Sequence, residues 1–227
     1  MKNHLFLLLL GIGLTSIISC KKDNTAINAE TTEAEALKPV TNTSRKYTVD
    51  TTASVINWLG SKPTGTHTGT INITKGEFFV KNDTLETGKF IIDMNSIIVT
   101  DPKEGKDKMN LENHLKGLGK EDNADHFFNT NRYPTGQFDI TAITADKNKT
   151  MIEGNLTLKD ITKNIKFPAV IHINDTLVTI NSENFKINRT LWNINFNSKS
   201  PVKNLGDQYI DDDIELKVSV SGKRKQK

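Results

Sequence analysis

The stretch GSKPTGTHTG, residues 60–69, has the glycines, hydroxyl groups, lysine and histidine from which phosphate-binding sites are built. A Walker-type phosphate loop needs a lysine directly after its second glycine and a helix directly after the loop. Here Thr66 follows Gly65, and in TGTINITKGEF, residues 68–78, Ile71 and Ile73 alternate with polar residues as in a half-buried strand. Without a helix N-terminus, the dipole that favours a bound anion is missing. The stretch therefore predicts a bend leading into a strand, with glycines where two backbones pass closely.

Two histidines lie in an acidic segment, which is the part of the chain most similar to a metal site. His114 and His126 stand near Glu112, Asp122 and Asp125. Their spacing matches none of the patterns typical of zinc sites. The chain also has no Gly-x-Ser-x-Gly, His-Glu-x-x-His or Cys-x-x-Cys motif. We therefore predict that the protein is not an enzyme and has no catalytic residue, metal or cofactor.

Cys20 is the only cysteine of the chain, so no disulfide can form within it. It follows Lys2 and an apolar run that is typical of a secretion signal and too short for a membrane span. The preceding Ser-Ile-Ile-Ser resembles the lipobox of bacterial lipoproteins, in which the signal is removed and the cysteine is acylated, for example with palmitate. The alternative is an ordinary signal with an incidental cysteine. We predict a signal peptide over residues 1–19, lipidation of Cys20, and a location in the cell envelope, anchored to a bacterial membrane and facing the periplasm or the exterior.

The charge of the chain is close to balanced. Removing residues 1–19 removes one of the 30 basic residues and none of the 27 acidic ones, which lowers the formal net charge from +3 to +2. This balance does not indicate a nucleic-acid partner. Residues 20–46 contain no aromatic residue and are rich in Thr, Ala, Glu, Asn and Lys, so we predict a flexible tether after the lipidated cysteine. Residues 47–222 have the size of one domain, and residues 223–227 form a basic tail, either solvated or in contact with a membrane surface.

Apolar and polar residues alternate in short runs through residues 47–222, as they do in strands with one buried face. Clusters of Asn, Asp and Lys separate these runs as turns do. One passage differs, because residues 108–118 space three leucines at helical intervals. Strands with one apolar face around a single interior predict an all-β sandwich or barrel. An antiparallel barrel of about eight strands, with this short helical insertion, has room for packed side chains or for one small ligand. The sets predicted to share a face are Ile56 and Trp58; Phe90, Ile92 and Met94; Phe138, Ile140 and Ala142; Ile152, Gly154, Leu156 and Leu158; Ile165, Phe167, Ala169, Ile171 and Ile173; Trp192, Ile194 and Phe196; and Ile214, Leu216, Val218 and Val220.

Five stretches, by their order and spacing, resemble the YceI-like family of exported, lipocalin-like β-barrels, here in a lipoprotein form. They are INWLGSKPTGTHTG, GKFIIDMNSIIVTD, LENHLKG with ADHFFNTNRYPTGQFDIT, IEGNLTLKDITKNIKFPAVI, and FKINRTLWNINFNSKS with IDDDIELKVSVSG. Together they extend over residues 47–222. The resemblance implies an all-β fold, an antiparallel lipocalin-like β-barrel. It also implies an elongated apolar interior that binds a long-chain lipid, such as a polyisoprenoid or a quinone tail.

The resemblance implies that large apolar residues of the matching strands line this interior, and ordinary core packing explains each of them equally well. His67 and Arg189 could meet a polar head group near the mouth of the barrel, whereas a local ion pair is the alternative for Arg189. We expect a membrane-anchored lipoprotein with a long-chain lipid or isoprenoid ligand. The alternative is a structural or interaction lipoprotein whose barrel is filled by side chains. The implied lining residues are Trp58, Phe90, Ile92, Phe138, Leu156, Phe167, Ile171, Phe185 and Trp192.

Overall fold

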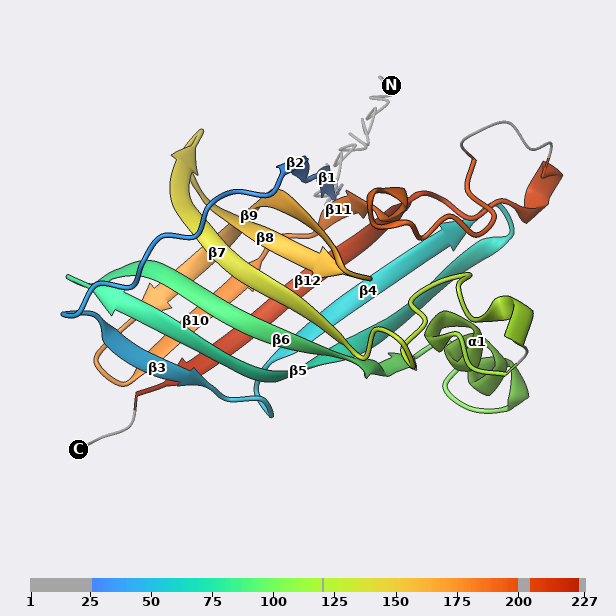
Figure 1. Ribbon diagram of the computed structural model, residues 1–227, viewed down its shortest axis with the longest axis horizontal. Helices are drawn as coiled ribbons and strands as arrows, with labels where there is room; N and C mark the ends of the chain where they lie inside the picture. Colours follow the sequence, from blue (N-terminus) through green and yellow to red (C-terminus); the bar gives the residue numbers. More distant parts are fainter. Residues whose placement is uncertain (1–25, 120, 200–204, 225–227) are drawn as a thin grey trace, which may run out of the picture.

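The computed structural model describes residues 26–119, 121–199 and 205–224, and the strands in this part of the chain close into a ring (Figure 1). Eight strands form the ring, every neighbouring pair is antiparallel, and the last strand pairs with the first. The predicted fold class, an antiparallel lipocalin-like barrel of about eight strands, is therefore confirmed. In ring order the strands are β3 (Arg45–Val49), β5 (Gly65–Lys81), β6 (Thr84–Val99), β7 (Thr135–Asp146), β8 (Lys149–Leu158), β9 (Ile161–Ile173), β10 (Leu177–Ser182) and β12 (Asp213–Lys223).

Two positions of the ring are each occupied by two consecutive strands. β4 (Val55–Lys62) follows β3 and also lies between β12 and β5. β11 (Phe185–Asn188) follows β10 along the same partner, β12. The wall of the barrel is therefore longer than β3 or β10 alone, and the barrel is elongated (Figure 1).

Three tight hairpins connect neighbouring strands of the ring at the turns 82–83, 147–148 and 159–160. In each hairpin the two residues between the paired strand ends both have positive φ. This conformation is that of a type I′ turn, whose twist matches the twist of the strands that it joins. Asn and Asp tolerate positive φ better than most residues do, so the Asn- and Asp-containing clusters at the first two turns form as predicted.

The alternation predicted for β7 is interrupted by a β-bulge. The register with β8 shifts between Ile140 and Ala142. Because one extra residue turns the following side chains to the other face, Ile143 packs against the core in the place predicted for Ala142. The prediction for Phe138 and Ile140 holds, and that for Ala142 is wrong.

The segment LWNINFN, residues 191–197, was predicted as a strand, but its first two residues end the 3₁₀-helix η2 (Arg189–Trp192) and the rest is not a strand. The side chain of Asn188 accepts a hydrogen bond from the backbone N–H of Thr190 (2.9 Å), which caps the start of this helix. Asn193, in the left-handed conformation, ends it. Trp192 and Ile194 are nevertheless fully buried, so the segment contributes to the core without being a strand.

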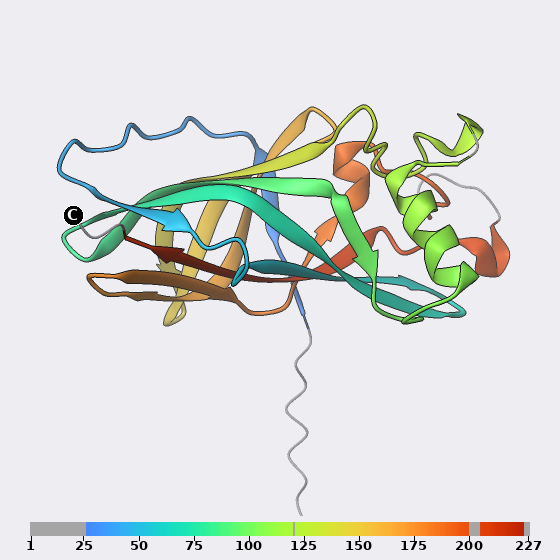
Figure 2. The same ribbon diagram turned by 90° about the horizontal axis from the view of Figure 1, so that it is seen from below.

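The helices lie at one end of the barrel. The predicted helical passage forms α1 (Lys106–Lys116), which ends at Gly117 in the left-handed conformation. Figures 1 and 2 show α1 at the same end as η3 (Gly206–Gln208), and η1 (Glu121–Asn123) follows α1 in the chain. None of the helices in the described ranges is long and apolar enough to cross a membrane.

The N-terminal part of the structure differs from the flexible tether predicted for residues 20–46. From residue 26 onward this segment lies along the barrel as β1 (Ile27–Asn28) and β2 (Glu30–Glu33), which pair with β11 and β9. It then crosses the outside of the barrel, where Glu35 exchanges two backbone hydrogen bonds with the side chain of Asn155 on β8 (2.9 and 2.7 Å; Figure 1). The composition of the segment excludes a core of its own, but open strand edges of the barrel supply partners for its backbone. The predicted signal peptide and Cys20 lie outside the described residues.

Candidate ligand-binding site

A cavity of about 640 Å³ occupies the barrel interior at the end where α1 lies. Strands supply one part of its wall, and α1, residues 127–128, residues 189–197 and residues 207–211 supply the rest. Its volume falls within the range of pockets that hold small molecules. Apolar side chains make up most of the lining, including Ile71, Met94, Ile97, Leu115, Phe127, Leu158, Ile187, Ile194, Phe196 and Ile214.

A second cavity, of about 80 Å³, lies further along the barrel interior, and all the residues that line it are apolar. The two cavities share four wall residues, Ile56, Ile92, Leu156 and Leu216. These side chains form a narrow place between a larger outer space and a smaller inner one. Both cavities therefore belong to the same elongated apolar interior, and we call these four side chains the constriction between them.

Eight of the nine residues predicted to line the interior lie on one or both cavities. Trp58 and Trp192 line the larger cavity, and Ile92 and Leu156 line both. Phe90, Phe138, Phe167 and Phe185 line the smaller cavity, where their rings contact each other in sequence from β6 to β11. Ile171 is not among the residues that line these two cavities, although it packs against the core. Ligand contact by these residues stays a prediction.

The mouth of the larger cavity is more polar than its interior. Lys62, His67, Asn197, Gln208 and Asp211 line this end. Residues 60–69, the stretch that resembles a phosphate loop, form the β4–β5 hairpin, in which Lys62 pairs with Gly65. A strand follows the bend and no helix does, as predicted. His67 lies at the mouth, with its ring Nδ1 within 3.0 Å of the carbonyl oxygen of Asp101. The hairpin therefore contributes a polar rim to an apolar cavity.

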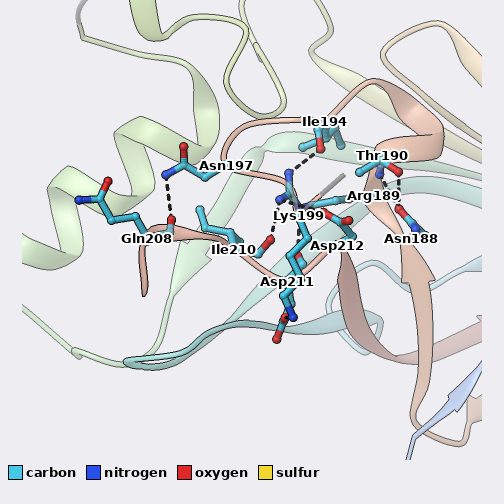
Figure 3. A network of polar contacts seen from close by, with 10 residues as sticks. All are labelled: Asn188, Arg189, Thr190, Ile194, Asn197, Lys199, Gln208, Ile210, Asp211 and Asp212. Carbon is cyan, nitrogen blue, oxygen red and sulfur yellow. Dashed lines mark hydrogen bonds and ion pairs between the residues drawn. The ribbon is translucent and has the colours of Figure 1, made fainter. Parts of the chain in front are cut away.

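Arg189 lines the cavity, but its guanidinium is engaged by the protein itself (Figure 3). It is 1% exposed and donates hydrogen bonds to the carbonyl oxygens of Ile194 (2.5 Å), Ile210 (3.0 Å) and Asp211 (3.1 Å). Burial lowers the pKa of Arg189, and the charges of Asp212 and Asp211 oppose this effect. The side chain thus joins the segment after η2 to the segment before β12, and a structural role explains all these contacts without a ligand head group.

His114 and His126, the pair grouped as the most metal-like in the sequence, are in contact. His114 Nε2 lies 2.9 Å from His126 Nδ1, and the His126 ring stacks on Phe196 at 3.9 Å. Burial, followed by the nearby His126, lowers the pKa of His114. Two of the three acidic residues of the grouping form ion pairs with lysines, Glu112 with Lys108 and Asp125 with Lys159. Within the described residues, no three His, Cys, Asp or Glu side chains are grouped so as to hold a metal ion.

Several lining residues were not predicted from the sequence, and their source is the insertion between β6 and β7. Leu115 on α1, together with Phe127 and Phe128, closes the side of the cavity that the strands leave open. The helical spacing of Leu111 and Leu115 was visible in the sequence, and it indicated an apolar face on the insertion. Which part of the barrel this face covers depends on contacts between α1 and β6, and these are set by the tertiary structure.

A closed antiparallel barrel of eight strands, with an apolar cavity that reaches one end, is the architecture of lipocalin-like binding proteins. The chain belongs to the YceI-like family, since the model of the YceI-like domain matches residues 47–222.

Solved structures share this fold at low sequence identity. BcnA of Burkholderia cenocepacia is 18% identical, with 76% of this chain and 98% of that chain covered and a TM-score of 0.57. A polyisoprenoid-binding domain from Saccharophagus degradans, implicated in plant cell wall breakdown, is 16% identical, with 79% and 98% covered and a TM-score of 0.53. No curated protein matches the chain in sequence.

Proposed function

We propose that the protein is a membrane-anchored lipoprotein of the cell envelope that binds one long-chain lipid, of the polyisoprenoid or quinone kind, inside its barrel. The observation that carries the proposal is the elongated apolar interior, in which a cavity of about 640 Å³ and one of about 80 Å³ share four wall residues. Membership of the YceI-like family and the polyisoprenoid-binding domain of similar fold support it.

The distribution of polar groups orients the ligand. The mouth carries Lys62, His67 and Gln208, whereas the lining of the inner cavity is entirely apolar. A polar head group therefore stays at the mouth, where it keeps contact with water, and the apolar tail extends past the constriction. Burial of one CH₂ group is worth about 0.8 kcal/mol, so each isoprene unit contributes roughly 2–3 kcal/mol before the cost of ordering the chain. Such a ligand needs no specific polar partner to bind.

Two measurements on the purified protein test the binding function. Mass spectrometry of its organic extract is expected to identify a long-chain lipid that copurifies with the chain. Parinaric acid, a fluorescent polyene fatty acid, is expected to bind saturably and to be displaced by a polyisoprenoid alcohol. An extract free of lipid, together with no saturable binding of parinaric acid, would favour a structural lipoprotein with an unoccupied interior.

The anchor is tested separately through Cys20. Stable attachment to a bilayer needs more than one buried acyl chain, and an acylated lipoprotein cysteine supplies this. Cys20→Ser is therefore expected to abolish acylation and to move the protein from the membrane fraction to the soluble fraction. If the wild-type N-terminus carries no acyl group, or if the variant stays in the membrane fraction, the anchor is not at Cys20.

A further inference from the structure

The wall of the barrel splits between β9 and β11. β10 pairs with β9 over residues 169–173, and the N–H of Glu183 still donates to the carbonyl of Pro168 (3.0 Å). From Phe185 onward the chain continues to pair with β12 but no longer pairs with β9. Among the described strands, no ladder joins β11 to residues 163–166 of β9. The edge of β9 at residues 163–166 and the edge of β11 therefore face each other across a gap in the wall.

Residues 27–33, which we name the seam strand, fill this gap. The first two residues pair with β11 in parallel, and the last four pair with β9 antiparallel. Between them the N–H of Ala29 donates to the carbonyl of Lys186 (2.8 Å), and Ala29 packs against the hydrophobic core. The seam strand is therefore a ninth strand of the wall, and it lies outside residues 47–222 that match the family.

The seam strand is held more weakly than β9, the strand beside which it lies. It makes two pairs with β11 and four with β9, whereas β8 and β9 pair at eight consecutive positions. Its core contact is an alanine, and Ile27 is 41% exposed. Its ion pair, between Glu33 and Lys163 (2.6 Å), has a carboxylate that is 87% exposed, and such pairs contribute little to stability. Segments with few buried apolar contacts open at a low free-energy cost.

The inner end of the apolar interior lies directly behind the seam strand. Phe167 on β9 and Phe185 on β11 stand on opposite sides of the gap, and their rings stack at 4.3 Å with 8° between the planes. Both rings and Ile165, the partner of Thr31 in the seam strand, line the smaller cavity. Detachment of residues 27–33 would uncover this part of the wall, where the stacked pair lines the tail end of the cavity.

We propose that the seam strand detaches to open a lateral slit between β9 and β11, through which the long apolar ligand enters and leaves sideways. This inference rests on the lipid-binding function proposed above. A lateral slit lets the chain transfer from a bilayer without passing its whole length through the polar mouth. In the anchored protein, residues 21–26 separate Cys20 from the seam strand, and six residues extend to about 22 Å at most. The slit is thus held next to the membrane surface.

Lys166 on β9 allows a matched test, because its direct partners are Glu30 of the seam strand on one side and Glu153 of β8 on the other. Glu30→Cys with Lys166→Cys links β9 to the seam strand. Glu153→Cys with Lys166→Cys links β9 to β8, which the inference leaves permanently paired. Direct cross-strand partners have the Cα separation that a disulfide needs. Cys20→Ser in both variants leaves the new pair as the only thiols.

Stopped-flow binding of parinaric acid to the oxidised and reduced proteins gives the rates of ligand exchange. In the variant with Glu30→Cys and Lys166→Cys, the disulfide is expected to slow ligand association and dissociation by about tenfold or more with little change in Kd, because it closes the route of the ligand and leaves the binding site as it was. Reduction of the disulfide is expected to restore both rates. The Glu153/Lys166 pair is expected to change neither rate. Equal rates in the two oxidised variants, with binding intact, would overturn the slit alone. Absence of saturable binding in the wild type would overturn the proposed function and the slit together.

Hydrogen exchange in the wild type tests the same inference without a crosslink. Amides of the seam strand are expected to exchange faster than the amides between β8 and β9, because local detachment exposes them. Equal protection of both sets would show that the seam strand opens only when the whole barrel unfolds, and this result would also overturn the slit.

Discussion

The indole of Trp58 covers the α-carbon of Gly69, its direct partner across β4 and β5. A methyl group at Gly69 would lie 2.4 Å from Cζ2 of the indole and 1.9 Å from the carbonyl oxygen of Ile98. Gly69 is the last residue of the stretch that resembles a phosphate loop, and its role is close packing under a ring that lines the cavity. This contact favours the interpretation of residues 60–69 as a bend leading into a strand over their interpretation as a phosphate loop.

Gly69→Ala is therefore expected to destabilise the barrel by roughly 1–3 kcal/mol or more, because the backbone of β6 cannot move away as a flexible side chain could. Gly60→Ala is the control, since a methyl group there would meet nothing within 4 Å. Chemical denaturation of both variants measures the difference. A stable Gly69→Ala protein would contradict the close packing.

Leu156, which separates the two cavities, is expected to set the length of the chain that can bind. Leu156→Phe narrows the constriction, and each CH₂ group kept out of the inner cavity lowers the binding free energy by about 0.8 kcal/mol. Affinity for a long polyisoprenoid alcohol is expected to fall by about tenfold relative to a short one, as two excluded CH₂ groups imply. Leu158→Phe, in the larger cavity only, is expected to affect both alcohols alike. An unchanged ratio in Leu156→Phe would mean that the ligand does not pass the constriction.

Substitution of Arg189 is expected to lower the stability of the fold more than it lowers the affinity for ligand. Arg189→Lys keeps the charge but loses most of the hydrogen bonds to three backbone carbonyls, and we expect a loss of about 2–4 kcal/mol in chemical denaturation because buried acceptors are left unpaired. Lys199→Ala, which removes an exposed ion pair with Asp211 in the same network (Figure 3), is expected to change stability by less than about 0.5 kcal/mol. If Arg189→Lys stays stable but binds ligand more weakly, Arg189 is a head-group contact after all.

The His114–His126 contact predicts that stability falls on mild acidification. The pKa of His114 is lower in the folded protein than its ordinary value of 6.5, mainly through burial, so the unfolded chain binds protons more readily in this range. Stability is then fully present above about pH 6.5 and decreases as the pH falls below it. Thermal unfolding between about pH 7 and pH 5 is expected to show this decrease in the wild type and a smaller one in His114→Leu. His172→Gln, on an exposed residue of β9, should retain the wild-type decrease; equal slopes in all three proteins would contradict the prediction.

The faces of the strands could be predicted from the sequence because the alternation that encodes them is local. Phe90, Ile92 and Met94 are buried as their spacing indicates, and a strand with one apolar face must bury it somewhere. The prediction failed where a short-range hydrogen bond or a bulge changed the period. Asn188 caps η2 in a segment that alternates like a strand, and the extra residue after Ile140 places Ile143 toward the core.

The sequence by itself determined the fold class, the apolar character of the interior and most of the residues that face it, since all of these follow from the types and periods of neighbouring residues. Only the tertiary structure decided how that interior is divided and closed. The constriction at Leu156, the carbonyl partners of Arg189 and the place of residues 27–33 between β9 and β11 all depend on contacts between segments far apart in the chain. A segment such as 27–33 has too few apolar residues to predict any structure on its own, and it is ordered by strand edges that exist only once the barrel has closed.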